Sequence, residues 1–175
     1  MSASILIAYA TRGGSTAEVA QSIAATMQEA GLAASAMAMA ELKSLEGYSA
    51  VILGAPLYCG KLPREFHRFV EEHAERLGSM RPWLFVLGPT RPDAKDFELA
   101  RKQAEQQIRR YGWLKIAELH IFGGRWDMQH LTFPFSLARH LPASVQAKIP
   151  PADIRDWAAI RGWALEIARM MKPAA

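Results

Sequence analysis

The sequence predicts an α/β fold, a doubly wound parallel sheet of five strands with helices on both faces. Short apolar runs rich in β-branched residues alternate with longer segments of helical periodicity along the chain. Such continuously apolar runs are typical of strands buried on both faces, and parallel neighbours need crossover connections. The 175 residues fit one domain, 1–175, and half of them are apolar, which suffices for a sizeable core.

Five apolar runs are the predicted strands. The first is SILIAYA, and the second, AASAMAM, has the weakest pattern. The third, YSAVILGAPL, contains Gly54 and Pro56 near its end, and PWLFVLGP and LKIAELHIFGG follow. By number, the predicted strands are 4–10, 33–39, 48–57, 82–89 and 114–124.

Helical periodicity lies between these runs. The first helix is predicted to begin with a capping box, in which Ser15 accepts from a first-turn N–H and Glu18 reaches back. One irregular region, 123–152, is too long for an ordinary loop and is interpreted as an insertion. Its middle is predicted to form a short helix with Pro134 in the first turn and Pro142 at the end. The predicted long helices are 16–30, 63–77, 96–111 and 153–171.

Composition and charge narrow the class of protein. The formal net charge is +4, and all but two of the 21 basic side chains lie beyond residue 60. This excess favours anionic partners, although ordinary surface charge explains it equally well. The single cysteine, Cys59, rules out an internal disulfide and fits a reducing compartment.

The sequence contains no pattern typical of a membrane-spanning segment or a signal peptide. No apolar run approaches the ~18–20 residues that span a bilayer, and the N-terminus has no signal-peptide pattern. We therefore expect a cytoplasmic protein and leave open peripheral contact with the inner face of the membrane. The five histidines follow no metal-ligand spacing, so no metal is predicted, and no nucleic-acid partner is expected. The oligomeric state stays open.

The loop after the first strand has the composition of a phosphate cradle. Open α/β sheets bind ligands at the carboxyl ends of their strands, where this loop lies. Its glycines allow a tight turn that exposes N–H groups, and the helix N-terminus adds partial positive charge. A simple strand-to-helix turn is the alternative. The cradle residues are Thr11, Arg12, Gly13, Gly14, Ser15 and Thr16.

The residues present exclude three alternatives: a dinucleotide-binding loop, a nucleoside-triphosphate loop and a phospho-receiver domain. The chain has neither G-x-G-x-x-G nor G-x-x-x-x-G-K-[ST] in this loop. A phospho-receiver domain needs acidic residues after the first strand and an aspartate after the third. The third strand here ends Ala55-Pro56-Leu57.

The run ILIAYATRGGSTAEVAQSIA resembles the start of a flavodoxin, whose first loop holds the phosphate of FMN. Three further segments resemble the branch of flavodoxin-like, menaquinone-dependent protoporphyrinogen IX dehydrogenases: VILGAPLYCGKLPREFHRFVEEHAERL, FGGRWDMQHLTFPFSLARHL and RDWAAIRGWALEIA. The resemblance implies a flavodoxin-like sheet with strand order 2-1-3-4-5. Gly13 departs from the family, which has a threonine there, and Arg12 is interpreted as compensating.

The resemblance also implies where the flavin ring lies. The loop after the third strand supplies apolar walls and backbone groups, with Tyr58 as the candidate for stacking and Gly60 able to let a peptide flip. The related dehydrogenases have their loop aromatic where Cys59 stands. We interpret Cys59 as a small loop residue rather than a redox thiol. The implied residues are Pro56, Leu57, Tyr58, Cys59, Gly60, Lys61, Pro89, Thr90, Arg91, Gly123, Gly124, Arg125 and Trp126.

Three functions follow from this resemblance. The first is an FMN-dependent oxidoreductase of heme biosynthesis that oxidises a tetrapyrrole and passes electrons to a quinone. The second is a flavodoxin electron carrier that docks on redox proteins. The third is an NAD(P)H-quinone reductase, for which the sequence has no nicotinamide signature. The basic charge and the insertion 123–152 favour the enzyme, and no catalytic acid or base is assigned.

Overall fold

A computed structural model describes residues 4–127, 137, 140–147 and 151–172. Five parallel strands form one sheet in the order β2-β1-β3-β4-β5, as predicted. The strands are β1 (Ser4–Tyr9), β2 (Ala33–Ala38), β3 (Ala50–Pro56), β4 (Trp83–Leu87) and β5 (Leu119–Phe122). The long helices are α1 (Ser15–Glu29), α2 (Arg64–Glu72), α4 (Ala94–Ile108) and α6 (Trp157–Met171).

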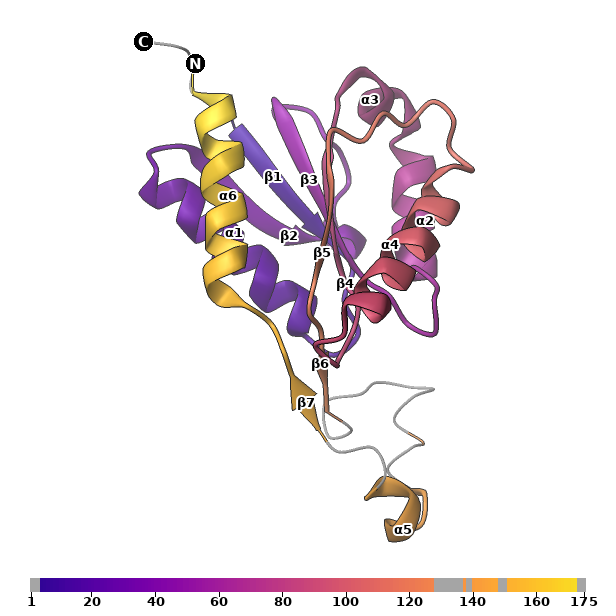
Figure 1. The fold of residues 1–175 in the computed structure, drawn as a ribbon. Coiled ribbons are helices and arrows are strands. Elements are labelled where there is room, and N and C mark those ends of the chain that lie inside the picture. The colour runs from indigo at the N-terminus through magenta and orange to yellow at the C-terminus, as the bar shows by residue number, and fades with distance from the viewer. Residues whose placement is uncertain (1–3, 128–136, 138–139, 148–150, 173–175) are drawn as a thin grey trace.

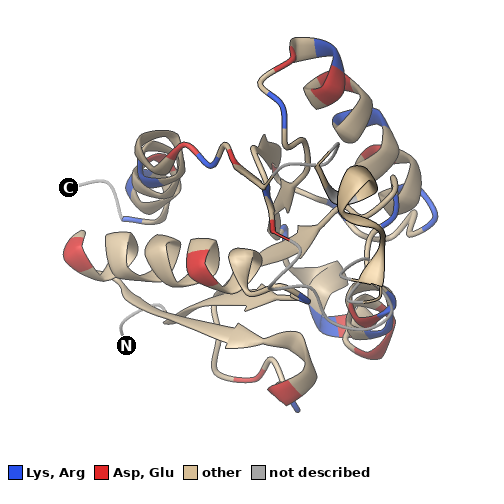
Figure 2. Cartoon of the chain, turned by 90° about the horizontal axis from the view of Figure 1, so that it is seen from below, with Lys and Arg blue, Asp and Glu red and all other residues tan. Residues whose placement is uncertain are grey.

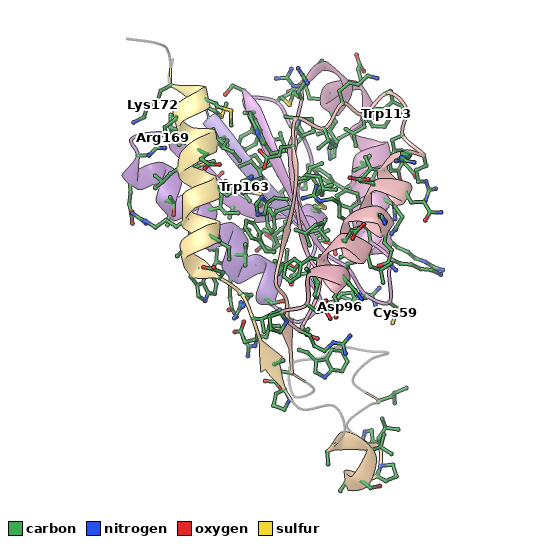
Figure 3. All side chains as sticks on the ribbon, viewed as in Figure 1. Cys59, Asp96, Trp113, Trp163, Arg169 and Lys172 are labelled. Carbon is green, nitrogen blue, oxygen red and sulfur yellow. The ribbon has the colours of Figure 1, made fainter. Side chains whose placement is uncertain are left out.

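Helices cover both faces of the sheet (Figure 1). Alternate residues of β1 separate two cores: Ile5 and Ile7 pack with α1 and α6, and Leu6 and Ala8 pack with the opposite face. Every residue of β3 is buried, because this strand lies inside the sheet with a helical layer on each side. Figure 3 shows Trp163 of α6 directed toward the sheet.

Most predicted elements differ by a few residues in their bounds, and three differ in a way that has a local structural reason. The helix predicted at 63–77 divides into α2 and α3 (Ala74–Ser79), with His73 between them at φ −109. The fifth strand begins only at Leu119, because Leu114 closes a turn by donating its N–H to the Tyr111 carbonyl. The last helix begins at Trp157, where the Asp156 carboxylate caps it by accepting from Ala159 N at 2.9 Å.

The insertion has paired ends. Strands β6 (Arg125–Trp126) and β7 (Ala152–Asp153) are antiparallel, and residues 128–136, 138–139 and 148–150 between them lie outside the described part. The helix predicted around Pro134 falls on those residues. The prediction that Pro142 ends that helix therefore stays untested, and Pro142 precedes the short helix α5 (Ala143–Gln146), which lies beyond the end of the sheet in Figure 1.

We expect Gly54→Ala to lower the free energy of unfolding by about 1–3 kcal/mol, because it overpacks the core. A Cβ at Gly54 would lie 2.2 Å from Cζ of Phe85, its fully buried partner on β4. Urea denaturation measures the change. Gly162→Ala in α6 is the matched control: no heavy atom lies within 4 Å of its new Cβ, so a gain of about 0.5–1 kcal/mol is expected. Equal effects of the two substitutions would contradict the packing argument.

Candidate functional site

The first loop turns tightly from β1 into α1. Thr11 Oγ1 accepts from the N–H of Gly14 at 3.0 Å, and Gly14 has a φ of +81, which favours glycine. A Cβ on Gly14 would meet no heavy atom within 4 Å, so open space lies beside the turn. The first-turn N–H groups of α1 have no partner within the helix. The loop therefore offers backbone donors to an anion.

The predicted capping box is wrong. Gly14, not Ser15, is the N-cap residue, and no side chain caps the helix. Ser15 is already helical because the chain makes its left-handed turn one residue earlier. The carboxylate of Glu18 reaches the guanidinium groups of Arg125 and Arg155 instead of the loop backbone.

Thr16 carries an orphaned hydroxyl. Its side chain is fully buried at the start of α1, and its Oγ1 has no hydrogen-bond partner among the described residues. Buried hydroxyls are normally paired because an unmade hydrogen bond costs about 1–3 kcal/mol. The orphan is therefore a sign of a polar group that belongs beside the first loop.

The loop after β3 folds as a two-residue hairpin. The backbones of Tyr58 and Lys61 exchange two hydrogen bonds, of 3.0 and 2.9 Å. The residues between them both have positive φ, +48 at Cys59 and +75 at Gly60, as a type I′ turn requires. The Gly60 carbonyl accepts from Gln107 Nε2 at 2.8 Å, so α4 holds this loop from behind.

Tyr58 joins the two loops. Burial raises the pKa of its phenol, and the Arg12 charge and hydrogen bonding to the backbone of Arg12 and Gly13 oppose that rise. The Arg12 guanidinium lies 6.0 Å from the centre of the Tyr58 ring. The tyrosine therefore leans toward the first loop.

A cleft of about 420 Å³ opens at the carboxyl edge of the sheet. Its walls come from the loops after β3, β4 and β5, from the start of α1 and from one face of α4. Figure 3 shows Cys59 and Asp96 at this lower end of the molecule. The lining residues are Ser15, Pro56, Leu57, Tyr58, Cys59, Gly60, Leu87, Gly88, Pro89, Thr90, Arg91, Asp96, Leu99, Ala100, Gln103, Gly124, Arg125 and Trp126.

Not every predicted site residue lines this cleft. Those outside the lining are Thr11, Arg12, Gly13, Gly14, Thr16, Lys61 and Gly123. The first five belong to the turn beside the cleft, and Gly123 packs against backbone, since a Cβ there would lie 2.2 Å from the Ile154 carbonyl oxygen. The missed residues are mostly on α4 at positions 96, 99, 100 and 103. Their helical spacing marks one face, which was the available signal.

An ion-pair network fixes the base of the insertion. Glu18 pairs with Arg125 at 3.2 Å and with Arg155 at 2.6 Å. Arg155, whose side chain is only 4% exposed, also binds both carboxylate oxygens of Asp153, and this contact lowers the pKa of Asp153. Figure 2 shows acidic and basic residues alternating between β7 and α6. The network therefore ties β6 and β7 to the first turn of α1.

Trp126 closes the cleft beside this network. Its indole Nε1 is buried and has no hydrogen-bond partner within the described ranges.

In the part of the chain that the structure describes, no helix has the length and apolarity to cross a membrane. No group of three or more metal-ligating side chains gathers among the described residues.

Comparison with known proteins gives a family match and a consistent fold. A family model for the flavodoxin domain matches residues 6–135. Protoporphyrinogen IX dehydrogenase [quinone] of Escherichia coli (strain K12) is 35% identical over 77 residues, 43% of this chain. The match spans only 42% of the length of that relative.

Solved flavodoxins share the architecture. Oxidised Flavodoxin 1 from Bacillus cereus has 16% identity and a TM-score of 0.61, covering 97% of this chain and all of that one. The Streptococcus pneumonia TIGR4 flavodoxin has 17% identity with the same coverage and TM-score. At this identity the likeness shows the fold alone.

We expect Cys59→Asn to raise the free energy of unfolding by up to about 1 kcal/mol, because asparagine accepts positive φ and Asn-Gly suits a type I′ turn. Cys59→Val should lower it by about 1 kcal/mol, because a β-branched side chain clashes there. The cysteine is exposed, so neither change alters the core. Chemical denaturation under reducing conditions compares the two. Equal stabilities would show that the turn does not limit this position.

Proposed function

Because the chain belongs to the flavodoxin domain family, we propose that it binds FMN in the cleft at the carboxyl edge of the sheet. Membership of this family implies a flavin. The observation that carries the proposal is the buried, unpartnered hydroxyl of Thr16 beside the first-turn N–H groups of α1. A phosphate supplies the acceptors that these donors lack.

The phosphate end of FMN is assigned to the first loop. Thr11 Oγ1 accepts from Gly14 and keeps its own O–H as a donor. Gly13, Gly14 and Ser15 offer backbone donors, and Arg12 adds a full positive charge. The open space beside Gly14 leaves room for a group with no side chain in its way.

The ring end is assigned to the rest of the cleft. Leu57 and Tyr58 provide an apolar and an aromatic wall, and Trp126 provides a second aromatic side chain on the β6 side. Pro89 and Thr90 also line the cleft and suit the ribityl chain. The Cys59–Gly60 peptide is the candidate for a hydrogen bond to the ring, because its turn has glycine at φ +75.

The chemistry proposed for this cleft is electron transfer, which bound FMN performs between a donor and an acceptor. The chain's own residues bind and orient the cofactor and set its electrostatic surroundings. Arg12 and Arg125 favour added negative charge near the cleft, and the apolar walls exclude water from it. No protein group is assigned as acid or base.

Oxidation of a tetrapyrrole with a quinone as acceptor is the proposed reaction. The supporting observations are the 35% identity to protoporphyrinogen IX dehydrogenase [quinone] and the insertion between β6 and β7. Leu137, Leu141 and Val145 around this insertion are 57%, 40% and 38% exposed. Such a surface suits a lipophilic quinone and peripheral contact with a membrane.

A flavodoxin-type electron carrier is the second candidate. The family match and the architecture of solved flavodoxins support it equally. A carrier requires a flavin and a docking face for redox proteins, but no site for a small substrate. Turnover of a small substrate therefore separates the two functions.

We expect Gly14→Asp to weaken FMN binding at least 100-fold, because it brings a carboxylate against the phosphate at an intermediate dielectric. Fluorescence titration of the apoprotein measures this. Gly14→Asn is the matched control, with the same shape and no charge. Asparagine tolerates the positive φ, so affinity should fall less than about tenfold.

Riboflavin supplies the second arm of this test. It lacks the phosphate, so it should bind the wild type far more weakly than FMN does and should not distinguish Asp from Asn at position 14. Equal affinity of the wild type for FMN and riboflavin would overturn the phosphate assignment. Equal loss of FMN in the two variants would assign the effect to backbone strain.

We expect the FMN-loaded protein to oxidise protoporphyrinogen IX anaerobically with a menaquinone analogue as acceptor. Porphyrin fluorescence and quinone absorbance follow the two half-reactions. The double variant Leu141→Ser with Val145→Ser should retain FMN and lose most quinone reduction. Leu99→Ser makes the same kind of change on the α4 wall of the cleft and tests that apolar surface. Absence of turnover in the loaded wild type would support the carrier instead.

A further inference from the structure

A chain of hydrogen bonds runs from the hairpin that lines the cleft to side chains of α4 and α2. It begins at Gln107 on α4, whose Nε2 donates to the Gly60 carbonyl at 2.8 Å and whose Oε1 accepts from Leu62 N at 2.8 Å. Nε2 also reaches the Gln103 carbonyl at 3.3 Å. These contacts fix which end of the amide is oxygen, and they clamp the hairpin that lines the cleft.

His67 on α2 is the next member. Its Nε2 lies 3.3 Å from Gln107 Oε1, which can only accept, so Nε2 carries a proton. Its Nδ1 lies 2.8 Å from the Tyr111 hydroxyl, and that hydroxyl lies 3.1 Å from Glu71 Oε1. Four side chains from α2, α4 and the turn after α4 therefore form one continuous path.

The path is one proton short. Its three contacts, Gln107–His67, His67–Tyr111 and Tyr111–Glu71, each need a hydrogen. A neutral imidazole provides one, the phenol provides one, and an ionised carboxylate provides none. With Nε2 protonated, the phenol can donate to Nδ1 or to Glu71, but not to both. One additional proton satisfies all three contacts at once.

Burial and the charges around His67 set the pH at which the imidazole takes up this proton. Burial lowers the pKa of His67, and the charge of Arg110 lowers it further, whereas the Gln107 hydrogen bond and Glu71 raise it. Arg110 follows α4 and lies 3.8 Å from Glu71. Burial and the hydrogen bond to Glu71 raise the pKa of Tyr111 to about 12, so the phenol keeps its proton. The imidazole is therefore neutral at pH 7 and charges as the pH falls.

We propose that His67, Tyr111 and Glu71 form a proton-uptake relay that controls, through Gln107, the hydrogen bonds to Gly60, which lines the cleft, and to Leu62, two residues further along the chain. The proton comes from solvent at Glu71, whose side chain is 56% exposed. In the protonated state, Nδ1–H donates to the Tyr111 oxygen, and the Tyr111 O–H donates to Glu71. The charged imidazole also strengthens its Nε2–H bond to Gln107.

This relay gives His67 a positioning role. Its charge acts on the hairpin through Gln107, which contacts both His67 and the Gly60 carbonyl, and on the cleft through the electric field of the cation. If the cleft holds FMN, as proposed above, a cation there favours the more negatively charged, reduced cofactor. The reduction potential should then become more positive as His67 charges.

The test is an NMR titration of the full-length apoprotein between pH 8 and pH 5. Imidazole ¹⁵N shifts should show Nε2–H alone at high pH and both nitrogens protonated at low pH. The backbone amides of Gly60 and Leu62 and the side-chain amide of Gln107 should shift with the same midpoint. Tyr111→Phe keeps the ring packing, removes the link to Glu71 and should lower that midpoint by about 0.5–1 pH unit.

Two variants separate the relay from a general effect of pH. His67→Gln should abolish the response of Gly60 and Leu62. His73→Gln is the matched control at the end of the same helix, where the His73 ring packs on Phe69 at 4.5 Å, and the response should persist. Loop amides that ignore the His67 titration, or that still shift in His67→Gln, would overturn the relay.

The FMN-loaded protein adds an independent readout. Its midpoint potential should gain a pH dependence centred on the His67 midpoint, and His67→Gln should remove that component. Failure to bind FMN would contradict the proposed function while leaving the apoprotein titration decisive for the relay. A potential that is identical in the wild type and His67→Gln at every pH would overturn the link to the cofactor.

Discussion

The parallel pairing of β1 with both β2 and β3 is the constraint on which the rest of the molecule depends. The chain leaves β1 toward β2 and later places β3 on the other side of β1. The loops after β1 and β3 therefore diverge at the point where strand order reverses, and a crevice results. Two cores of apolar side chains hold the helices that flank this crevice.

Local signals made much of the fold predictable. The strands are short apolar runs, and the turn 11–16 uses glycine and hydroxyl residues whose effects act within a few positions. The prediction that Glu18 belongs to a capping box was wrong because its partners are distant in sequence. Glu18 binds Arg125 and Arg155, which lie 107 and 137 positions away. Sequence spacing carries no information about such a partner, and the break at His73 likewise has no glycine or proline to announce it.

In the candidate site, too, residues marked by local sequence signals could be predicted, and residues brought together only by packing could not. Because strand ends meet at one edge of a parallel sheet, the sequence predicted that the loop after β3 lines the cleft, whereas of the predicted cradle residues only Ser15 lines it. The α4 residues Asp96 and Gln103 were missed, because their helical spacing marks one face of α4 but does not show that this face lies toward a cleft. The contact of His67 with Tyr111 joins positions 44 apart, and only the packing of α2 beside the end of α4 creates it.

The two ends of the cleft are consequently held by different chemistry. At the first loop, backbone geometry and the pairing of Glu18 with Arg125 and Arg155 set the structure, and arginine keeps its charge across the physiological pH range. At the hairpin, neutral amides and an imidazole set it, and the imidazole, whose pKa is lowered by burial, gains charge as the pH falls below neutral. Salt should therefore act mainly on the first end and pH mainly on the second. Affinity for an anionic group and the electrostatics of the hairpin can then vary separately in one small cleft.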